Sequence, residues 1–403
     1  MTTVGVDVHD AAFLADPYPA FAEARAAAPV QWHEGMGMWL AYGHAAANQV
    51  LRTRTLGRIW TPRWPDLDLP AFTLIHVNSL LENEPPEHTR LRRLVAAAFA
   101  RGHVERLRPR VAELASALAD RVADEGCDGG PVDLISTYAE PLPVQVIAEL
   151  LGVPESDWGL LRPWSNAIVK MYEYTVSDAQ RDAAEAASAE FVEYLRGMVA
   201  ERRGHLTDDL VSSLIAETDS DGARLTEDEL ITTCTLLLNA GHEATVNVVG
   251  NGVLALGQQP DQWQRLLDDA ELVPTAVEEL IRYDSPLQLF ERTAISDTEI
   301  DTGGGAAVTV EAGQKIAALL GAANRDPAVF TDPDRFDVGR TDNPHLGFGA
   351  GIHFCVGAPL ARVELQTSLR TLTGRFPRLA LAGEPPVRTE FVIRGLRSLP
   401  VTI

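Results

Sequence analysis

Apolar residues recur at helical spacing along most of the chain. Alanine-rich stretches with apolar residues at every third or fourth position predict helices over 18–28, 44–52, 87–100, 104–125, 134–151 and 178–203. A longer stretch, 226–257, contains no proline and starts with Thr226, followed three residues later by Glu229, which is the spacing of a capping box. At 1.5 Å per residue this helix would be about 48 Å long, enough to cross a whole domain.

Strand patterns are few and short. They fall at 29–42, at 289–300, at 306–316 and in the last dozen residues, and the glycine-rich segments 126–130 and 303–305 are typical of turns within a fold. We find no internal repeat and no polar low-complexity linker. The pattern therefore predicts a mainly α protein with small β-sheets at its edge, folded as one large domain over residues 1–403.

Composition narrows the classes of protein. The 403 residues include 34 basic and 57 acidic side chains, a formal net charge of −23, which argues against nucleic acid or an anionic membrane surface as the main partner. Cys127, Cys234 and Cys355 are too few and too scattered for a disulfide framework and fit a reducing compartment. The N-terminus lacks the basic and apolar regions of a signal peptide, and the most apolar long stretch carries His242 and Glu243 near its middle. We expect a soluble, cytoplasmic protein with no membrane segment.

One cysteine lies in a glycine-rich loop that precedes a predicted helix. The run from Pro344 to Arg362 reads PHLGFGAGIHFCVGAPLAR, and a helical pattern follows over 358–372. A cysteine just before a helix start sees the positive end of the helix dipole, which favours the thiolate, and glycines let the backbone approach a flat ligand closely. A buried structural cysteine on a tight turn is the alternative. A dinucleotide-binding loop is excluded, because the spacing is not G-x-G-x-x-G and no βαβ unit with a downstream acid accompanies it.

This loop resembles the haem-binding signature of the cytochrome P-450 superfamily. The matching positions are Phe348, Gly349, Gly351, His353, Cys355 and Gly357. The resemblance runs from DPYPAF near the start of the chain to RGLRSLPV at its end. It implies the cytochrome P-450 fold, with a long central helix over the haem, and haem b as the cofactor. It also implies that Cys355 is the axial thiolate ligand of the haem iron.

Further motifs match the same family. Glu279, Arg282 and Arg335 resemble its Glu-Arg-Arg triad, a structural network that would hold the cysteine loop against its helix. Without the resemblance, an acid and an arginine three residues apart would be an ordinary surface ion pair. The resemblance also implies contacts to the haem propionates, since arginine and histidine donors suit carboxylates, from His88, Arg92, Arg292 and His353.

The middle of the long predicted helix carries Ala240 and Gly241, which would make room for the porphyrin and dioxygen, and then Glu243. A close-packed helix crossing is the alternative for the small pair. In the family, an acid and the alcohol after it deliver protons to oxygen, but here the residue after Glu243 is Ala244 and the hydroxyl comes at Thr245. Glu243 and Thr245 are therefore the candidate catalytic residues for proton transfer. One residue turns about 100° around a helix, so Thr245 cannot simply replace the missing group. We therefore predict that the substrate or an ordered water completes the proton path, with a narrow substrate range.

The resemblance also implies a substrate pocket with an apolar, partly aromatic lining. Its candidate residues are Trp60, Phe72, Val77, Leu81, Ile168, Tyr172, Leu237, Ala240, Leu289, Phe290, Val392 and Ile393. Such a lining suits a hydrophobic or aromatic small molecule, including a natural product. Many of these residues could equally belong to the core.

No flavin or iron–sulfur segment is evident, so electrons are expected from a ferredoxin and its reductase. Arg90, Arg93 and Arg101 could form a basic docking face for the ferredoxin, or they could be an ordinary solvated helix face. We expect a monomer.

The sequence thus predicts a cytochrome P-450 monooxygenase that oxidises a hydrophobic small molecule with dioxygen and two electrons. Two other functions remain open. The first is an oxidase of the same family that couples or desaturates a biosynthetic intermediate without inserting oxygen, which the loss of the alcohol at Ala244 allows. The second is a haem-binding sensor or carrier that does not turn over, against which Glu243 argues. A haem-free structural protein would leave the matching positions unexplained.

Overall fold

Helices form 57% of the structure. The computed structural model describes residues 6–62, 67–100, 103–217, 222, 224–303, 305–383, 388 and 390–403. Their contacts group them into two compact units, and each is treated by itself below. The sheet unit comprises the described residues of 1–57, 115–139 and 244–403, and the helical unit those of 58–114 and 140–243.

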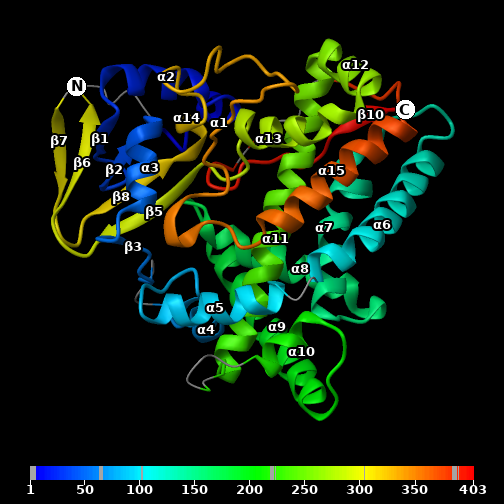
Figure 1. The fold of residues 1–403 in the computed structure, drawn as a ribbon, viewed down its shortest axis with the longest axis horizontal. Helices are drawn as coiled ribbons and strands as arrows, with labels where there is room; N and C mark the ends of the chain where they lie inside the picture. Colours follow the sequence, from blue (N-terminus) through cyan, green and yellow to red (C-terminus); the bar gives the residue numbers. More distant parts are fainter. Residues whose placement is uncertain are drawn as a thin grey trace. The chain divides into compact units, whose positions relative to one another are not determined.

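The sheet unit contains three sheets (Figure 1). Its strands are β1 (Val30–His33), β2 (Met38–Ala41), β3 (Leu56–Gly57), β4 (Val132–Asp133), β5 (Leu289–Ala294), β6 (Thr298–Gly303), β7 (Ala306–Val310), β8 (Lys315–Leu319), β9 (Ala380–Leu381) and β10 (Pro400–Thr402). The five-stranded sheet has the order β1-β2-β8-β5-β3, and only the β2–β8 pair is parallel. The order β4-β10-β9 forms a second sheet, and β6 and β7 form a hairpin.

Helices cover these sheets and form the rest of the sheet unit. They are α1 (Ala11–Ala15), α2 (Tyr18–Ala27), α3 (His44–Arg52), α12 (Pro260–Asp268), α13 (Val273–Tyr283), α14 (Leu320–Ala323) and α15 (Ala358–Arg375), with a π-helical turn at Ile135–Ala139 and 3-10 turns at Ala270–Leu272 and Gly351–His353. On α3, Val50 is completely buried and belongs to one apolar core with Ile316 of β8 and Leu346 of the cysteine loop. The end of α3 therefore packs against the cysteine loop.

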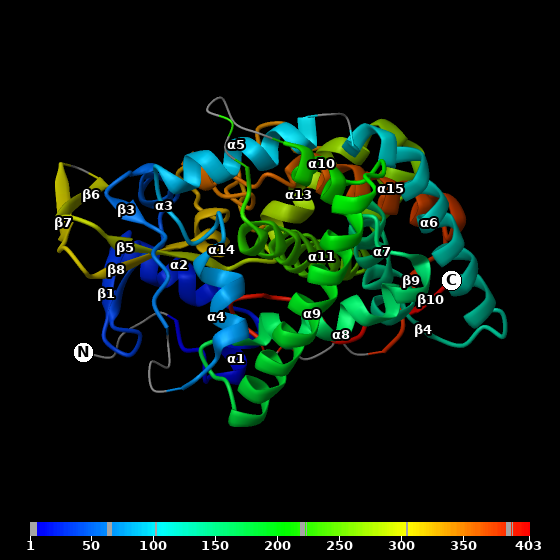
Figure 2. The ribbon, with the colours of Figure 1, turned by 90° about the horizontal axis from the view of Figure 1, so that it is seen from below.

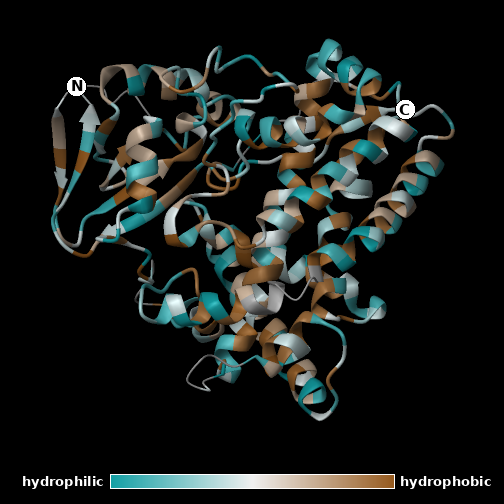
Figure 3. Cartoon of the chain, viewed as in Figure 1, coloured by the Kyte–Doolittle hydropathy of each residue, from teal (hydrophilic) through white to brown (hydrophobic). Residues whose placement is uncertain are grey.

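The helical unit contains α4 (Pro70–Val77), α5 (Glu87–Ala100), α7 (Pro141–Leu151), α8 (Trp158–Val169), α9 (Asp178–Gly204) and α10 (Leu210–Ala216), with 3-10 turns at Glu155–Asp157 and Lys170–Tyr172. Figure 2 shows α4, α8 and α9 side by side. Two of the four boundaries between the units fall within long helices, α6 (His103–Glu125) and α11 (Glu227–Gln258). Figure 3 shows apolar and polar residues alternating along α6 and α15, as expected for helices with one apolar and one polar face.

Several predicted elements are confirmed, and two boundaries were wrong. The capping box at the start of α11 is present, with the Thr226 N–H donating to Glu229 Oε2 at 2.8 Å and the Glu229 N–H to Thr226 Oγ1 at 3.2 Å. The stretch 134–151 is not one helix, because Pro141 begins a new helix after the π-helical turn. The stretch 306–316 is not one strand, because the chain turns at Gly313, whose φ is +86°.

In the part of the chain that the structure describes, no helix is both long and apolar enough to cross a membrane.

A buried charge network links α13 to the loop before the cysteine. Glu279 and Arg282 have no exposed side-chain surface, and Arg282 donates to Glu279 through Nε at 2.7 Å and Nη2 at 2.8 Å. The third side chain is Arg340, whose Nε lies 3.1 Å from Glu279 Oε2. The prediction of Arg335 for this role was wrong: Arg335 is exposed, and its carbonyl accepts hydrogen bonds from Arg282 and Arg340. Only the backbone of Arg335 belongs to the network.

This correction predicts different costs for two arginine substitutions. Arg340→Gln leaves the buried Glu279 with fewer donors and is expected to lower the free energy of unfolding by about 2–3 kcal/mol. Arg335→Gln keeps the backbone contacts and is expected to change it by less than about 0.5 kcal/mol. Urea unfolding followed by far-UV circular dichroism measures both. Equal losses for the two variants would show that the Arg335 side chain does take part.

Candidate active site

Cys355 lies between the 3-10 turn Gly351–His353 and the start of α15. Its N–H donates to the carbonyl of Phe348 at 2.9 Å, so the loop is closed on itself around the cysteine. The side chain is neither fully buried nor exposed, and α15 begins three residues later at Ala358, with Gly357 at its N-cap. The sulfur therefore lies at the positive end of an 18-residue helix, where a thiolate is favoured.

Two glycines give the loop its path. Gly349 and Gly351 have φ values of +71° and +72°, a left-handed conformation that other residues adopt at a cost of about 1–2 kcal/mol. At Gly351 a Cβ would lie 2.5 Å from the carbonyl oxygen of Leu51 at the end of α3. At Gly349 it would lie 3.4 Å from the ring of Phe290. Gly351 thus allows close approach of the loop to α3, whereas Gly349 is required for its backbone conformation and not for space.

The middle of α11 carries an accessible stripe. Ala240 is exposed, and Gly241, Glu243 and Ala244 keep part of their surface, although the turns on either side are buried. Thr245 is only 4% exposed. The one-residue shift of the hydroxyl therefore places it on a buried part of the helix, as the helical rotation requires.

The close-packed alternative for the small pair holds for Gly241. A Cβ at this position would lie 2.8 Å from Cδ1 of Ile147 on α7, so the glycine is needed for contact between the two helices. Ala240, one residue earlier, is exposed and has no such explanation.

His242, beside Glu243, is a buried residue to which the sequence motif assigns no role. Its side chain is 1% exposed. Its Nδ1 lies 3.2 Å from Ser165 Oγ on α8 and 3.9 Å from Glu243 Oε1. Burial, with a smaller effect of the Arg162 charge, lowers the pKa of His242 to about 3. His242 is therefore neutral at physiological pH.

The four predicted propionate contacts fall in pairs. His88, which is 2% exposed, and Arg92, which is half-buried, lie four residues apart on α5 and so share a helix face. Arg292 on β5 is 3% exposed, and its Nη1 donates to the carbonyl of Glu291. His353 ends the 3-10 turn before Cys355. The first pair belongs to the helical unit and the second to the sheet unit, and their haem contacts remain predictions.

Three predicted substrate residues of the helical unit converge on His76 of α4, which the sequence analysis missed. The His76 ring stacks on Trp60 at 4.6 Å between ring centroids and contacts Phe72 at 4.2 Å. Its Nδ1 donates to the Phe72 carbonyl at 2.7 Å, which leaves Nε2 to accept from the Tyr172 hydroxyl at 3.2 Å. The spacing of Phe72 and His76, four residues apart, is the helical signal that could have identified this cluster.

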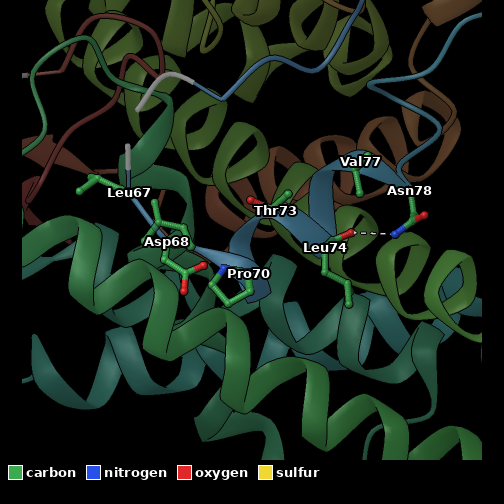
Figure 4. Close-up of a pocket in the computed structure, with 8 residues that line it drawn as sticks. Leu67, Asp68, Pro70, Thr73, Leu74, Val77 and Asn78 are labelled. Atoms are coloured by element: carbon green, nitrogen blue, oxygen red, sulfur yellow. Dashed lines mark hydrogen bonds between the residues drawn. The ribbon is translucent and has the colours of Figure 1, made fainter. Parts of the chain in front are cut away.

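The remaining substrate candidates differ in accessibility. Ile168 has no accessible surface, so its prediction as a lining residue was wrong, and it belongs to the core of the helical unit. Leu237 is nearly buried, and Leu81 keeps part of its surface. Val77 is 46% exposed and lines an open groove of about 430 Å³ along α4 (Figure 4), bounded by Leu67, Asp68, Leu69, Pro70, Thr73, Leu74, Val77 and Asn78.

In the sheet unit, two chain segments bring the late candidates together. The N–H of Gln288 donates to the carbonyl of Val392 at 3.1 Å, and Leu287 pairs with Ile393 in an antiparallel bridge. Phe290, Val392 and Ile393 are partly accessible, whereas Leu289 is 4% exposed.

Arg90 is held by two carboxylates, Glu87 and Glu229, which reduces its contribution to the predicted docking face. Arg93 is exposed, and Arg101 lies outside the described residues.

These observations fit a haem. A soft sulfur donor at a helix N-terminus suits the iron, and the left-handed glycines let the backbone around it pass where side chains could not. Buried His88 and Arg292 offer hydrogen-bond donors for carboxylates.

Comparison with known proteins agrees with this chemistry. The family "Cytochrome P450" matches residues 36–392. The chain is 40% identical to cytochrome P450 monooxygenase PikC of Streptomyces venezuelae, over 96% of this chain and 91% of that protein. It is 38% identical to 6-deoxyerythronolide B hydroxylase of Saccharopolyspora erythraea, over the full length of both. The crystal structure of P450BioI in complex with an acyl-ligated acyl carrier protein matches with a TM-score of 0.90 at 35% identity, over 97% of this chain and 100% of that one.

The chain belongs to the cytochrome P450 family. It is a haem b-dependent monooxygenase with the mainly α fold of that family, as the sequence predicts.

The glycine geometry predicts a graded series of alanine variants. Gly351→Ala combines a left-handed φ with a clash against backbone and is expected to lower the free energy of unfolding by more than about 3 kcal/mol. Gly349→Ala carries the φ cost alone, about 1–2 kcal/mol. Gly374→Ala, at an exposed helical position of α15 with nothing near a Cβ, is the control and is expected to gain up to about 1 kcal/mol. Urea unfolding ranks the three, and a Gly351→Ala loss no larger than that of Gly349→Ala would contradict the contact with α3.

Proposed function

We propose that this monooxygenase hydroxylates a hydrophobic natural product, with Cys355 as the thiolate ligand of the haem iron and Glu243 as the acid that handles protons. The placement of Cys355 at the start of α15, in a loop closed through Phe348, carries the proposal. When bound, the haem supplies the iron at which dioxygen is reduced with two electrons. Two relatives, 6-deoxyerythronolide B hydroxylase and mycinamicin IV hydroxylase/epoxidase, are named for natural-product substrates, which supports the substrate class.

The remaining site residues take the roles that their chemistry supports. His88, Arg92, Arg292 and His353 neutralise the haem propionates, and Ala240 leaves space on the oxygen side. In the cluster of Trp60, Phe72, His76 and Tyr172, the buried Phe72 and His76 support the partly accessible Trp60 and Tyr172, whose rings suit a flat or apolar part of the substrate. A ferredoxin and its reductase supply the electrons to a monomeric enzyme in the cytoplasm, and exposed Arg93 contributes to the docking face.

Proton delivery depends on the substrate or on water in this proposal. Glu243 retains about a fifth of its side-chain surface, so it can exchange protons with solvent, but Ala244 supplies no hydroxyl. Thr245 is buried and cannot take over without a change in the helix. A hydroxyl or amide of the bound substrate, or an ordered water, therefore completes the path beside Glu243.

The first experiment tests the ligand. The reduced, carbon-monoxide-bound protein is expected to show the long-wavelength Soret band characteristic of thiolate-ligated haem, and Cys355→His is expected to lose that band. Cys234→Ala, a change at a buried cysteine in another helix, is the control and should keep it. A wild-type band typical of histidine ligation would refute the assignment of Cys355.

The second experiment tests the proton path. A substrate is first found by screening hydrophobic natural products for a change in Soret absorption on binding. Ala244→Thr is then expected to leave the ratio of product to consumed reducing equivalents unchanged or lower, and Glu243→Gln to reduce product formation by about 10²-fold or more. Thr245→Val, which keeps the shape of the side chain, is expected to leave the ratio of product to consumed reducing equivalents unchanged.

A severalfold rise in coupling for Ala244→Thr, with unchanged substrate binding, would contradict assistance by substrate or water. Product mass separates the two reaction types in the same assay. Hydroxylation adds one oxygen atom, whereas coupling or desaturation removes hydrogen.

A further inference from the structure

Behind the cysteine loop lies a second carboxylate of α13, adjacent to the buried Glu279. Glu278 accepts hydrogen bonds from Arg362 of α15, Nε to Oε1 at 2.7 Å and Nη2 to Oε2 at 2.8 Å. Two parallel contacts of this kind fix the plane of the guanidinium as well as its position. Burial alone would raise the pKa of Glu278, but hydrogen bonds from Arg362 and His345 outweigh it and lower the pKa to about 2. Glu278 is therefore a fixed negative charge at neutral pH.

His345, at the start of the cysteine loop, binds the same carboxylate. Its Nε2 lies 3.0 Å from Glu278 Oε2, and its Nδ1 accepts the backbone N–H of Gly347 at 3.1 Å. Because a backbone N–H can only donate, Nδ1 carries no proton and Nε2 is the donor to Glu278. Glu278 thus connects α15 to the loop through two side chains of defined orientation.

The Arg362 guanidinium, which binds Glu278 through two of its nitrogens, also lies over the ring of Phe348. Its Cζ lies 4.5 Å from the centroid of the Phe348 ring, and the carbonyl of Phe348 accepts the N–H of Cys355. The hydrogen bond to Glu278 raises the pKa of Arg362, and the charge of Cys355 adds to this effect. Arg362 thus lies against the ring of Phe348, the residue whose carbonyl holds the N–H of Cys355.

We propose that Arg362, oriented by Glu278, is a positioning residue that holds a positive charge beside Phe348 and the Cys355 sulfur and so favours reduction of the iron bound there. Reduction from Fe(III) to Fe(II) adds one electron and no proton, so the centre gains one negative charge. A fixed positive charge nearby stabilises the reduced state more than the oxidised one. The inference rests on the proposed role of Cys355 as iron ligand.

The midpoint potential of the holoenzyme, titrated without substrate or redox partner, tests this role. Arg362→Gln removes the charge and is expected to lower the equilibrium constant for reduction about tenfold, which is 59 mV for one electron. Arg362→Lys keeps the charge and should retain most of the wild-type value. Arg370→Gln is the control, since it makes the same charge change at an exposed position two turns further along α15, and it should leave the potential unchanged.

A second variant, expected to shift the midpoint potential in the opposite direction, tests the proposal if Arg362→Gln fails to bind haem. Glu278→Gln keeps an acceptor for Arg362 but removes the balancing negative charge, so the potential is expected to become more positive. The carbon-monoxide spectrum is recorded first for wild type and every variant. Absence of the thiolate band in wild type would refute the proposed function itself.

With that band present, three results would overturn the role of Arg362 alone. The first is a midpoint potential in Arg362→Gln equal to that of wild type. The second is a shift in Arg362→Lys as large as that in Arg362→Gln, and the third is a shift to a more negative potential in Glu278→Gln.

Discussion

A carboxylate with no exposed surface must be matched by donors on every side, and Glu279 is such a group. Two arginines, the backbone amide of Asp337 and the side chain of Asn343 all donate to it. Losing any of these donors leaves a buried charge that the protein interior cannot solvate. Because the donors come from α13 and from the segment 337–343, this one requirement fixes the stretch of chain that leads into the cysteine loop.

The neighbouring Glu278 extends the same constraint to the loop itself. Adjacent residues of a helix point about 100° apart, so two consecutive glutamates of α13 serve different partners. Glu279 holds the chain before the loop, whereas Glu278 holds His345 within it and Arg362 after it. The cysteine is thus fixed from both ends by charges on a single turn of helix. A residue at the site gains precision when the groups around it are themselves locked by packing and hydrogen bonds.

Structural features around this site could be predicted from the sequence where they depend on neighbouring residues, and not where they depend on a contact between distant segments. The glycines around Cys355 and the capping box of α11 depend on residues a few positions apart, so their pattern is visible in one dimension. The identity of the third network arginine is not local. Arg335 and Arg340 lie in one irregular segment without a helical or strand period, and only its path decides which side chain reaches Glu279 and which contributes its carbonyl. His76 could have been found from its spacing to Phe72, but its pairing with Tyr172, almost one hundred residues away, could not.

The two halves of the chemistry are held in contrasting ways. On the cysteine side, Glu279 is completely buried, Glu278 is paired with Arg362 in a fixed geometry, and the loop turns through two left-handed glycines. In the middle of α11, by contrast, Glu243 keeps part of its surface, its neighbour His242 is neutral, and Ala244 has no hydroxyl. A proton path with one link missing from the protein depends on what is bound. Under the proposed proton path, substrate selectivity is therefore expected to depend not only on the shape of the pocket but also on whether the bound molecule, or the water it retains, can supply that link beside Glu243.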